Sequence, residues 1–176
     1  NGLIDESWGT AGRAILTLGT DADDGIALAQ WGAREIFLAG SSVQSAKDYA
    51  MARTVNGALV PAGERDDTFG FSVGMLSLVD NADKITMDSS GRLMNAGSDS
   101  SYGIIERWNV GGGGGYDTSF GTTGYIRVSN LFFRNLQVDT MGRYVVNNST
   151  TQLRRYHTNG TLDTSLFSDG LAYINP

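Results

Sequence analysis

Short runs in which hydrophobic and polar residues alternate are the main pattern along this chain. Residues 84–88 (KITMD), 125–129 (YIRVS) and 135–139 (NLQVD) are typical runs, and glycine, asparagine and aspartate lie between them. Alternation with a period of two residues predicts strands that present one face to a core. The glycine-containing intervals predict tight turns. We therefore expect an all-β fold.

The predicted strands recur in one order, here named A to D. Strand A is expected at 13–18, 74–79 and 125–129, strand B at 25–30, 84–88 and 135–139, strand C at 35–40, 92–97 and 143–148, and strand D at 48–54, 102–108 and 152–157. Glycine lies between strands B and C each time, at Gly32, Gly91 and Gly142. The order predicts three four-stranded repeats.

An acidic corner precedes each strand A and marks the repeat independently. It begins with aspartate, continues with serine or threonine two residues later, and is clearest in DTSFG (117–121). The four aspartates, 46 to 61 residues apart, are Asp5, Asp66, Asp117 and Asp163. Aspartate and serine at this spacing form hydrogen-bonded turns. We interpret the four aspartates as structural turn residues and not as catalytic groups.

The markers divide the chain into one repeat domain that covers residues 1–176. The repeats are expected at about 12–69, 70–120 and 121–167, and an extra strand follows at 170–176. The first repeat carries an insertion before its closing aspartate.

The motifs resemble the bacterial delta-60 repeat family. Its pattern, roughly DGKILVAGSS…ALARYNADGSLDTSFG, is similar to residues 90–121 and 141–167 here, although Leu166-Phe167 replaces its Phe-Gly. The resemblance covers nearly the whole chain. It implies four-stranded blades like those of a β-propeller, and an extracellular or bacterial cell-surface location. It implies no particular activity.

Three blades leave the closure of such a fold open. Propellers usually close with about four to eight blades, and open sheet edges promote aggregation. We therefore expect propeller-like blades that are completed by homo-oligomerisation, as a dimer or a trimer. The alternative is a β-trefoil, in which the twelve strands close within one chain.

Composition excludes several classes of partner and cofactor. The net charge is −6 and the pI is about 4.6, which argues against nucleic acid as a partner. The chain has no cysteine and therefore no disulfide or thiolate metal site. No apolar run approaches the roughly 20 residues that a membrane-spanning helix needs, so we expect no membrane insertion.

No catalytic set is evident, and we expect the chain not to be an enzyme. His157 is the only histidine, and the five glycines at 111–115 lack the Lys-Ser/Thr ending of a phosphate-binding loop. A glycoside-hydrolysing propeller would need two convergent carboxylates. The candidate acids, which do not recur as a pair, are Glu35, Glu64 and Glu106.

No cofactor is expected, although one acidic stretch could contribute calcium ligands. Asp21, Asp23 and Asp24 offer carboxylate oxygens, which calcium prefers. A closing glutamate at the distance of a calcium loop is missing, and an exposed turn explains the same residues without a metal.

Aromatic residues near polar ones are the strongest candidates for ligand binding. A ring can cover the apolar face of a sugar while polar groups pair with its hydroxyls. The candidates are Trp31, Trp108, Tyr102, Tyr116 and Tyr49. The alternative is that these rings pack between the blades.

The sequence favours a non-catalytic binding or adhesion module of a bacterial surface or fibre protein, with a surface glycan or cell-surface receptor as its partner. The alternative is a structural oligomerisation or spacer module without a ligand of its own.

Overall fold

The computed structural model describes residues 2–4, 6, 11, 23–31, 35–42, 48–57, 60–65, 81–110, 115–148, 152–167 and 169–173. Twelve strands and no helix occur among them. The strands are β1 (Asp23–Trp31), β2 (Glu35–Ser42), β3 (Asp48–Gly57), β4 (Val60–Arg65), β5 (Asn81–Met87), β6 (Leu93–Ser98), β7 (Tyr102–Trp108), β8 (Tyr125–Ser129), β9 (Phe133–Val138), β10 (Tyr144–Asn148), β11 (Gln152–Tyr156) and β12 (Leu171–Tyr173). The expected all-β fold is confirmed.

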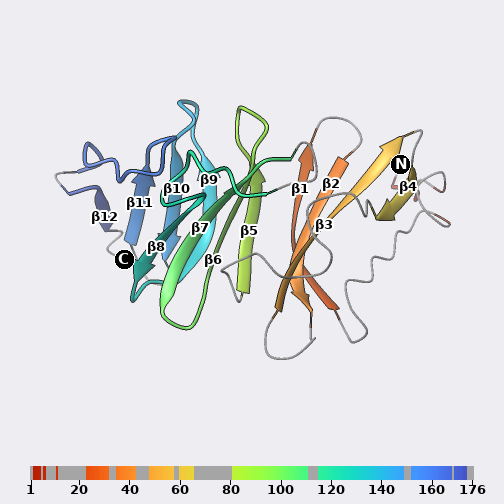
Figure 1. The fold of residues 1–176 in the computed structure, drawn as a ribbon, viewed down its shortest axis with the longest axis horizontal. Coiled ribbons are helices and arrows are strands. Elements are labelled where there is room, and N and C mark those ends of the chain that lie inside the picture. The colour runs from red at the N-terminus through yellow and green to blue at the C-terminus, as the bar shows by residue number, and fades with distance from the viewer. Residues whose placement is uncertain are drawn as a thin grey trace.

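The strands form three antiparallel sheets of four strands, each in chain order. The sheets are β1–β4, β5–β8 and β9–β12, and Figure 1 shows them one after another from orange through green to blue. Their first strands lie against each other, because β5 contacts both β1 and β9. No helix within the described ranges could cross a membrane.

Most predicted strands are present. Strands B, C and D correspond to β1–β3, β5–β7 and β9–β11, and the strand A expected at 125–129 is β8. The extra strand expected at 170–176 corresponds to β12. The strands expected at 13–18 and 74–79 lie outside the described residues.

The sheets are out of phase with the predicted repeats. β8 pairs with β7, and β12 pairs with β11. Each of these two sheets therefore consists of strands B, C and D together with the strand A that follows them. In the first sheet the fourth strand is β4, a segment that the sequence assigned to an insertion. Pro61 and Gly63 have low strand propensity, so the sequence does not predict this strand. Both residues are tolerated because β4 lies at the edge of its sheet.

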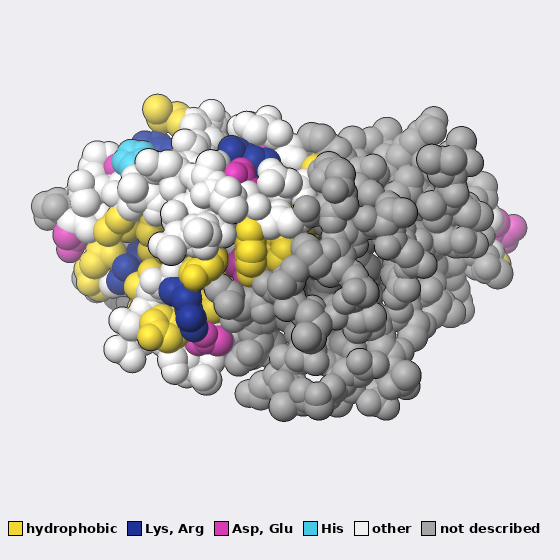
Figure 2. Space-filling model, in the orientation of Figure 1, with side chains coloured by type: hydrophobic (Ala, Val, Ile, Leu, Met, Phe, Trp, Pro, Cys, Tyr) yellow, Lys and Arg dark blue, Asp and Glu magenta, His cyan; other side chains and the backbone are white. Residues whose placement is uncertain are grey.

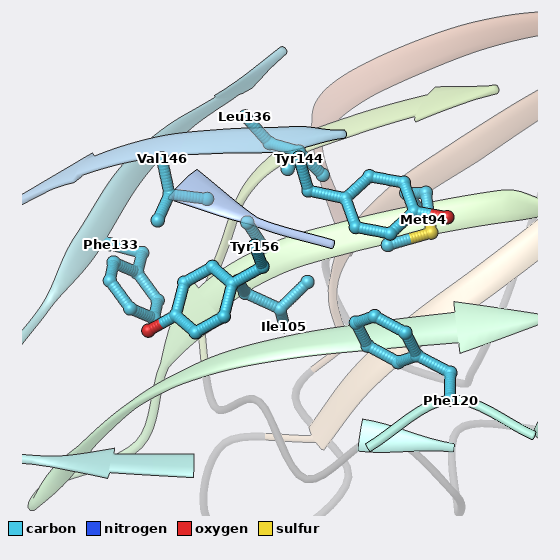
Figure 3. Packing of buried hydrophobic residues seen from close by; sticks show 9 residues of the cluster. Met94, Ile105, Phe120, Phe133, Leu136, Tyr144, Val146 and Tyr156 are labelled. Carbon is cyan, nitrogen blue, oxygen red and sulfur yellow. The ribbon is translucent and has the colours of Figure 1, made fainter. Parts of the chain in front are cut away.

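The larger core lies between the β5–β8 and β9–β12 sheets (Figure 3). Met94 and Ile105 come from β6 and β7, and they face side chains from β9 and β10. Burial of each aliphatic or aromatic side chain contributes about 1.5–3 kcal/mol. The buried members are Met94, Ala96, Ile105, Phe120, Phe133, Leu136, Tyr144, Val146 and Tyr156.

A second core lies on the opposite face of the β5–β8 sheet. Ile85, Leu93 and Trp108 pack there with Ala29 of β1. The two middle strands of this sheet, β6 and β7, are therefore buried on both faces.

Candidate functional site

The acidic corner at Asp117 is a hydrogen-bonded turn that follows β7. Its Oδ1 accepts bonds from the Ser119 N–H at 3.1 Å and from the Ser119 hydroxyl at 2.6 Å. The Asp117 N–H donates to the Arg107 carbonyl at 2.8 Å, and the Phe120 N–H donates to the Asp117 carbonyl at 3.0 Å. On the other carboxylate oxygen, Oδ2, Arg107 Nη2 lies at 2.9 Å and Arg92 Nη1 at 3.4 Å. The corner has the bonds of an Asx turn, with its charge balanced by arginine.

The corner at Asp163 has the same bonds. Ser165 donates its N–H at 3.0 Å and its hydroxyl at 2.6 Å to Oδ1. Arg155 Nε lies at 2.7 Å and Arg143 Nη1 at 3.3 Å from Oδ2. The Leu166 N–H donates to the Asp163 carbonyl at 3.1 Å, as Phe120 does in the first corner.

A second repeated aspartate closes the hairpin between β5 and β6. It was not among the residues predicted from the sequence. Asp88 Oδ1 accepts from the backbone N–H of Ser90 at 2.8 Å and of Arg92 at 2.9 Å, and Oδ2 accepts from Arg92 Nε at 2.7 Å. Gly91 has a φ of +76°, a conformation that favours glycine. The pattern Asp-x-x-Gly-Arg is the signal that could have revealed it. The same bonds recur at Asp139, Met141 and Arg143, with Gly142 also at +76°.

Arg107 joins the Asp117 corner and the Asp88 hairpin to the next sheet. Its Nη1 donates to the Tyr144 hydroxyl at 3.2 Å and to the Thr158 carbonyl. The Tyr144 hydroxyl donates in turn to Asp88 Oδ2 at 3.2 Å. The guanidinium also lies over the Phe120 ring, 4.8 Å from its centroid. The β5–β8 sheet thus holds the β9–β12 sheet through a buried polar network as well as through the core.

The charges of the network fit a structural role. Partial burial raises the pKa of Asp117, but the hydrogen bonds of Ser119 and the nearby arginines outweigh it and hold that pKa below its usual value. The hydrogen bond from the Ser165 hydroxyl is the main cause of a strongly lowered pKa at Asp163. Burial raises the pKa of the Tyr144 phenol, which keeps its proton available for donation. The carboxylates of Asp117 and Asp163 are therefore ionised, and both are held by hydrogen bonds and arginine ion pairs.

The described aromatic candidates contribute to packing. Trp108 is 1% exposed and stacks on Tyr116 with 4.2 Å between ring centroids. This burial agrees with the alternative that the ring packs between sheets, because a buried ring presents no face to a sugar. Tyr116 is half-buried. Tyr102 is also half-buried, and the Arg127 guanidinium lies over its ring at 4.2 Å.

Several predicted residues cannot be placed as side chains. Trp31 is the last residue of β1 and pairs with Glu35, so the strand extends one residue beyond the strand B expected at 25–30. Asp23 and Asp24 begin the same strand. The side chains of these residues and those of Tyr49 and Glu64, together with all of Asp5, Asp21 and Asp66, lie outside what the structure describes.

Glu106 is a fully buried carboxylate in β7. It accepts bonds from the Asn95 amide at 2.8 Å and from the Tyr116 hydroxyl at 2.6 Å. These donors allow a carboxylate to be buried at moderate cost. Cross-strand pairing places the group in one row with Asn95 and Ile85, on the face of the sheet that carries the second core.

His157, Asp163 and Ser165 come close without forming a nucleophilic site. His157 Nε2 and the Ser165 hydroxyl both approach Asp163 Oδ1, at 3.6 and 2.6 Å. A serine nucleophile needs the histidine beside the hydroxyl, with the aspartate behind the histidine. Here the aspartate lies between them. Within the described ranges, no group of three or more histidine, aspartate or glutamate residues could hold a metal ion.

A comparison with protein-family models found no match for the chain, and a comparison with curated proteins found none either. The resemblance to delta-60 repeats therefore depends on the motifs alone.

Proposed function

We propose that this chain is a non-catalytic structural module that stacks sheets of one repeat type and assembles with further copies of itself. The observation that carries the proposal is the network of Arg107, Tyr144 and Asp88 across two sheets. The two described acidic corners, at Asp117 and Asp163, are bonded within the fold.

The same proposal interprets the sheets as propeller-type blades. Three observations support this: each sheet has four antiparallel strands, the strands follow chain order, and the first strands β1, β5 and β9 lie next to each other. In a propeller the first strands of adjacent blades converge in this way near the central axis. In this proposal a chain with three such sheets associates with another copy through an end sheet. The family resemblance supports an extracellular or cell-surface place for the assembly.

Solution mass tests this function. We expect sedimentation equilibrium to give a dimer or a trimer at concentrations where the chain stays folded. A monomer at every concentration would remove the assembly role.

Glycan binding is a second candidate, and one described cluster favours it. Tyr102 is half-buried, Arg127 lies over its ring and also pairs with Asp99, and the cluster lies at the surface where β7 begins. A ring beside charged groups suits a sugar.

A glycan array is the test of this second candidate. Tyr102→Ala should abolish binding, and Tyr173→Ala, at an exposed tyrosine of β12, should not. An array without any signal for the unmodified chain contradicts the candidate.

A further inference from the structure

The face of the β5–β8 sheet that contacts β9–β12 has a counterpart on the far face of the β9–β12 sheet. Cross-strand pairing sets two rows on each face, because directly paired residues point the same way. The covered face has the rows Thr86–Met94–Arg107 and Lys84–Ala96–Ile105–Ile126. The counterpart, here named the outer face, has the rows Gln137–Val145–Arg155 and Asn135–Asn147–Leu153–Ala172.

Exposure differs between the faces at two of the four matched charged positions. Arg143 and Asp163, at 22% and 2%, are no more exposed than Arg92 and Asp117, at 26% and 12%. The other two pairs differ as follows. The Arg107 side chain is 2% exposed, and Arg155 at the same position is 17% exposed. Asp88 is 2% exposed, and its counterpart Asp139 is 23% exposed. Gln137 is exposed as well. The outer face therefore presents Arg155, Asp139 and Gln137 at the surface, whereas Ala172 in its second row is buried.

The hydrogen bonds show what the covered face receives from its neighbour. Asp88 Oδ2 accepts from the Tyr144 hydroxyl as well as from its own hairpin arginine. Within the described part of the chain, Asp139 Oδ2 accepts only from Arg143. Arg107 reaches the next sheet through Nη1, whereas Arg155 uses Nε and Nη2 within its own corner. Among the described residues, Asp139 Oδ2 thus receives one bond fewer than Asp88 Oδ2, and Arg155 makes no bond to another sheet.

The outer face is self-complementary in charge and hydrogen bonding. Two guanidinium groups and two carboxylates pair there within the chain, and of these the Asp163 carboxylate is buried: Arg143, Arg155, Asp139 and Asp163. Amide side chains replace the alanine, threonine and lysine of the covered face, at Asn147, Gln137 and Asn135. An amide both donates and accepts, as the Tyr144 hydroxyl does in the covered interface.

Apolar residues adjoin this polar surface. Leu166 takes the place of Phe120, which packs on the next sheet, and Phe167 beside it is exposed. Figure 2 shows hydrophobic side chains gathered with arginine and acidic groups at the end of the molecule where β11 and β12 lie. Polar groups mixed with exposed apolar ones are typical of protein interfaces.

We propose that the outer face binds the same face of a second copy of this chain, sheet against sheet, about a two-fold axis. The arginines of each copy then approach Asp139 and the amides of the other, in an isologous contact of the kind that closes most homodimers. This inference rests on the assembly role proposed above and names the surface that carries it.

Asn147 provides the test, because it lies in the middle of the face on β10. Asn147→Lys should convert the dimer to a monomer, since a two-fold axis brings the two added charges together. Tyr173→Lys is the matched control and should remain a dimer, because Tyr173 is exposed and follows Ala172 on β12, so that its side chain points to the opposite face of the sheet. Far-ultraviolet circular dichroism and the urea midpoint verify that both variants fold.

Disulfide trapping gives an independent result, because the chain has no cysteine of its own. Oxidised Asn147→Cys should run as a covalent dimer, and Tyr173→Cys should not.

If the Asn147→Lys variant is still a dimer, the chain assembles but not through the outer face, and this inference is overturned while the assembly role stands. A chain that is monomeric throughout overturns both proposals. A monomer that binds glycans, and loses them with Asn147→Lys, assigns the face to a sugar and overturns this inference.

Discussion

Replacing Arg107 with methionine should strongly destabilise the protein. Methionine keeps an unbranched, flexible stem that can still pack beside Phe120. It removes the charge that faces Asp117 at 2.9 Å and the donors to Ser119, Tyr144 and Thr158.

The magnitude follows from burial. Breaking a buried ion pair by removing one partner costs about 3–5 kcal/mol, because the remaining charge is left without compensation. Asp117 retains the bonds of Ser119 and the weaker contact with Arg92, and its side chain is 12% exposed. We therefore expect the lower end, about 3 kcal/mol, which lowers the folding constant roughly a hundredfold.

Urea unfolding followed by tryptophan fluorescence measures this loss. The matched control is Arg155→Met, which removes the same ion pair from the second corner but no described contact with another sheet. It should therefore cost clearly less than Arg107→Met. Equal losses for both variants, or a loss below about 1 kcal/mol for Arg107→Met, would refute the inter-sheet role.

Two further outcomes are expected from the same fold. Gly160→Ala should cost about 1–3 kcal/mol in urea unfolding, because its φ is +90° and an added Cβ would lie 2.7 Å from the Gly121 nitrogen. Gly115→Ala has a φ of +120° but open space around it, so it should cost less, and the reverse order would contradict the packing. The pKa values of Asp117 and Asp139 are lowered in the fold, so their stabilisation is complete above the unfolded value of about 3.9 and is lost as the pH falls through the lowered values. As the pH is lowered below about 4, the urea concentration at the unfolding midpoint should therefore decrease. A midpoint that increases on acidification would be inconsistent with these ion pairs.

Local pattern was enough to predict nearly every strand. Residues 84–88 alternate, and a glycine turn at Gly91 leads to the next strand, so β5 and β6 follow from neighbouring residues alone. The corner at Asp117 is equally local, since its bonds to Ser119 span two residues.

Long-range partners could not be predicted in the same way. The sequence has arginine at the equivalent positions 107 and 155, but it does not show that the donors of Arg107 reach Tyr144, which is 37 residues away. Similarly, Trp108 beside a glycine run resembles an exposed platform, and only the packing of β1 against β5 makes it a core residue. The grouping of strands into sheets could not be predicted either, because it depends on which strand β8 or β12 pairs with after the acidic corner.

The central claim is that Arg107 and Tyr144 act together to hold one sheet on the next. A double-mutant cycle measures this directly, with Arg107→Met, Tyr144→Phe and the double variant compared by urea unfolding. We expect a coupling energy of about 1–2 kcal/mol, because either single change already breaks the shared bond. Losses that add within about 0.3 kcal/mol would show that the two residues act independently and would contradict the account.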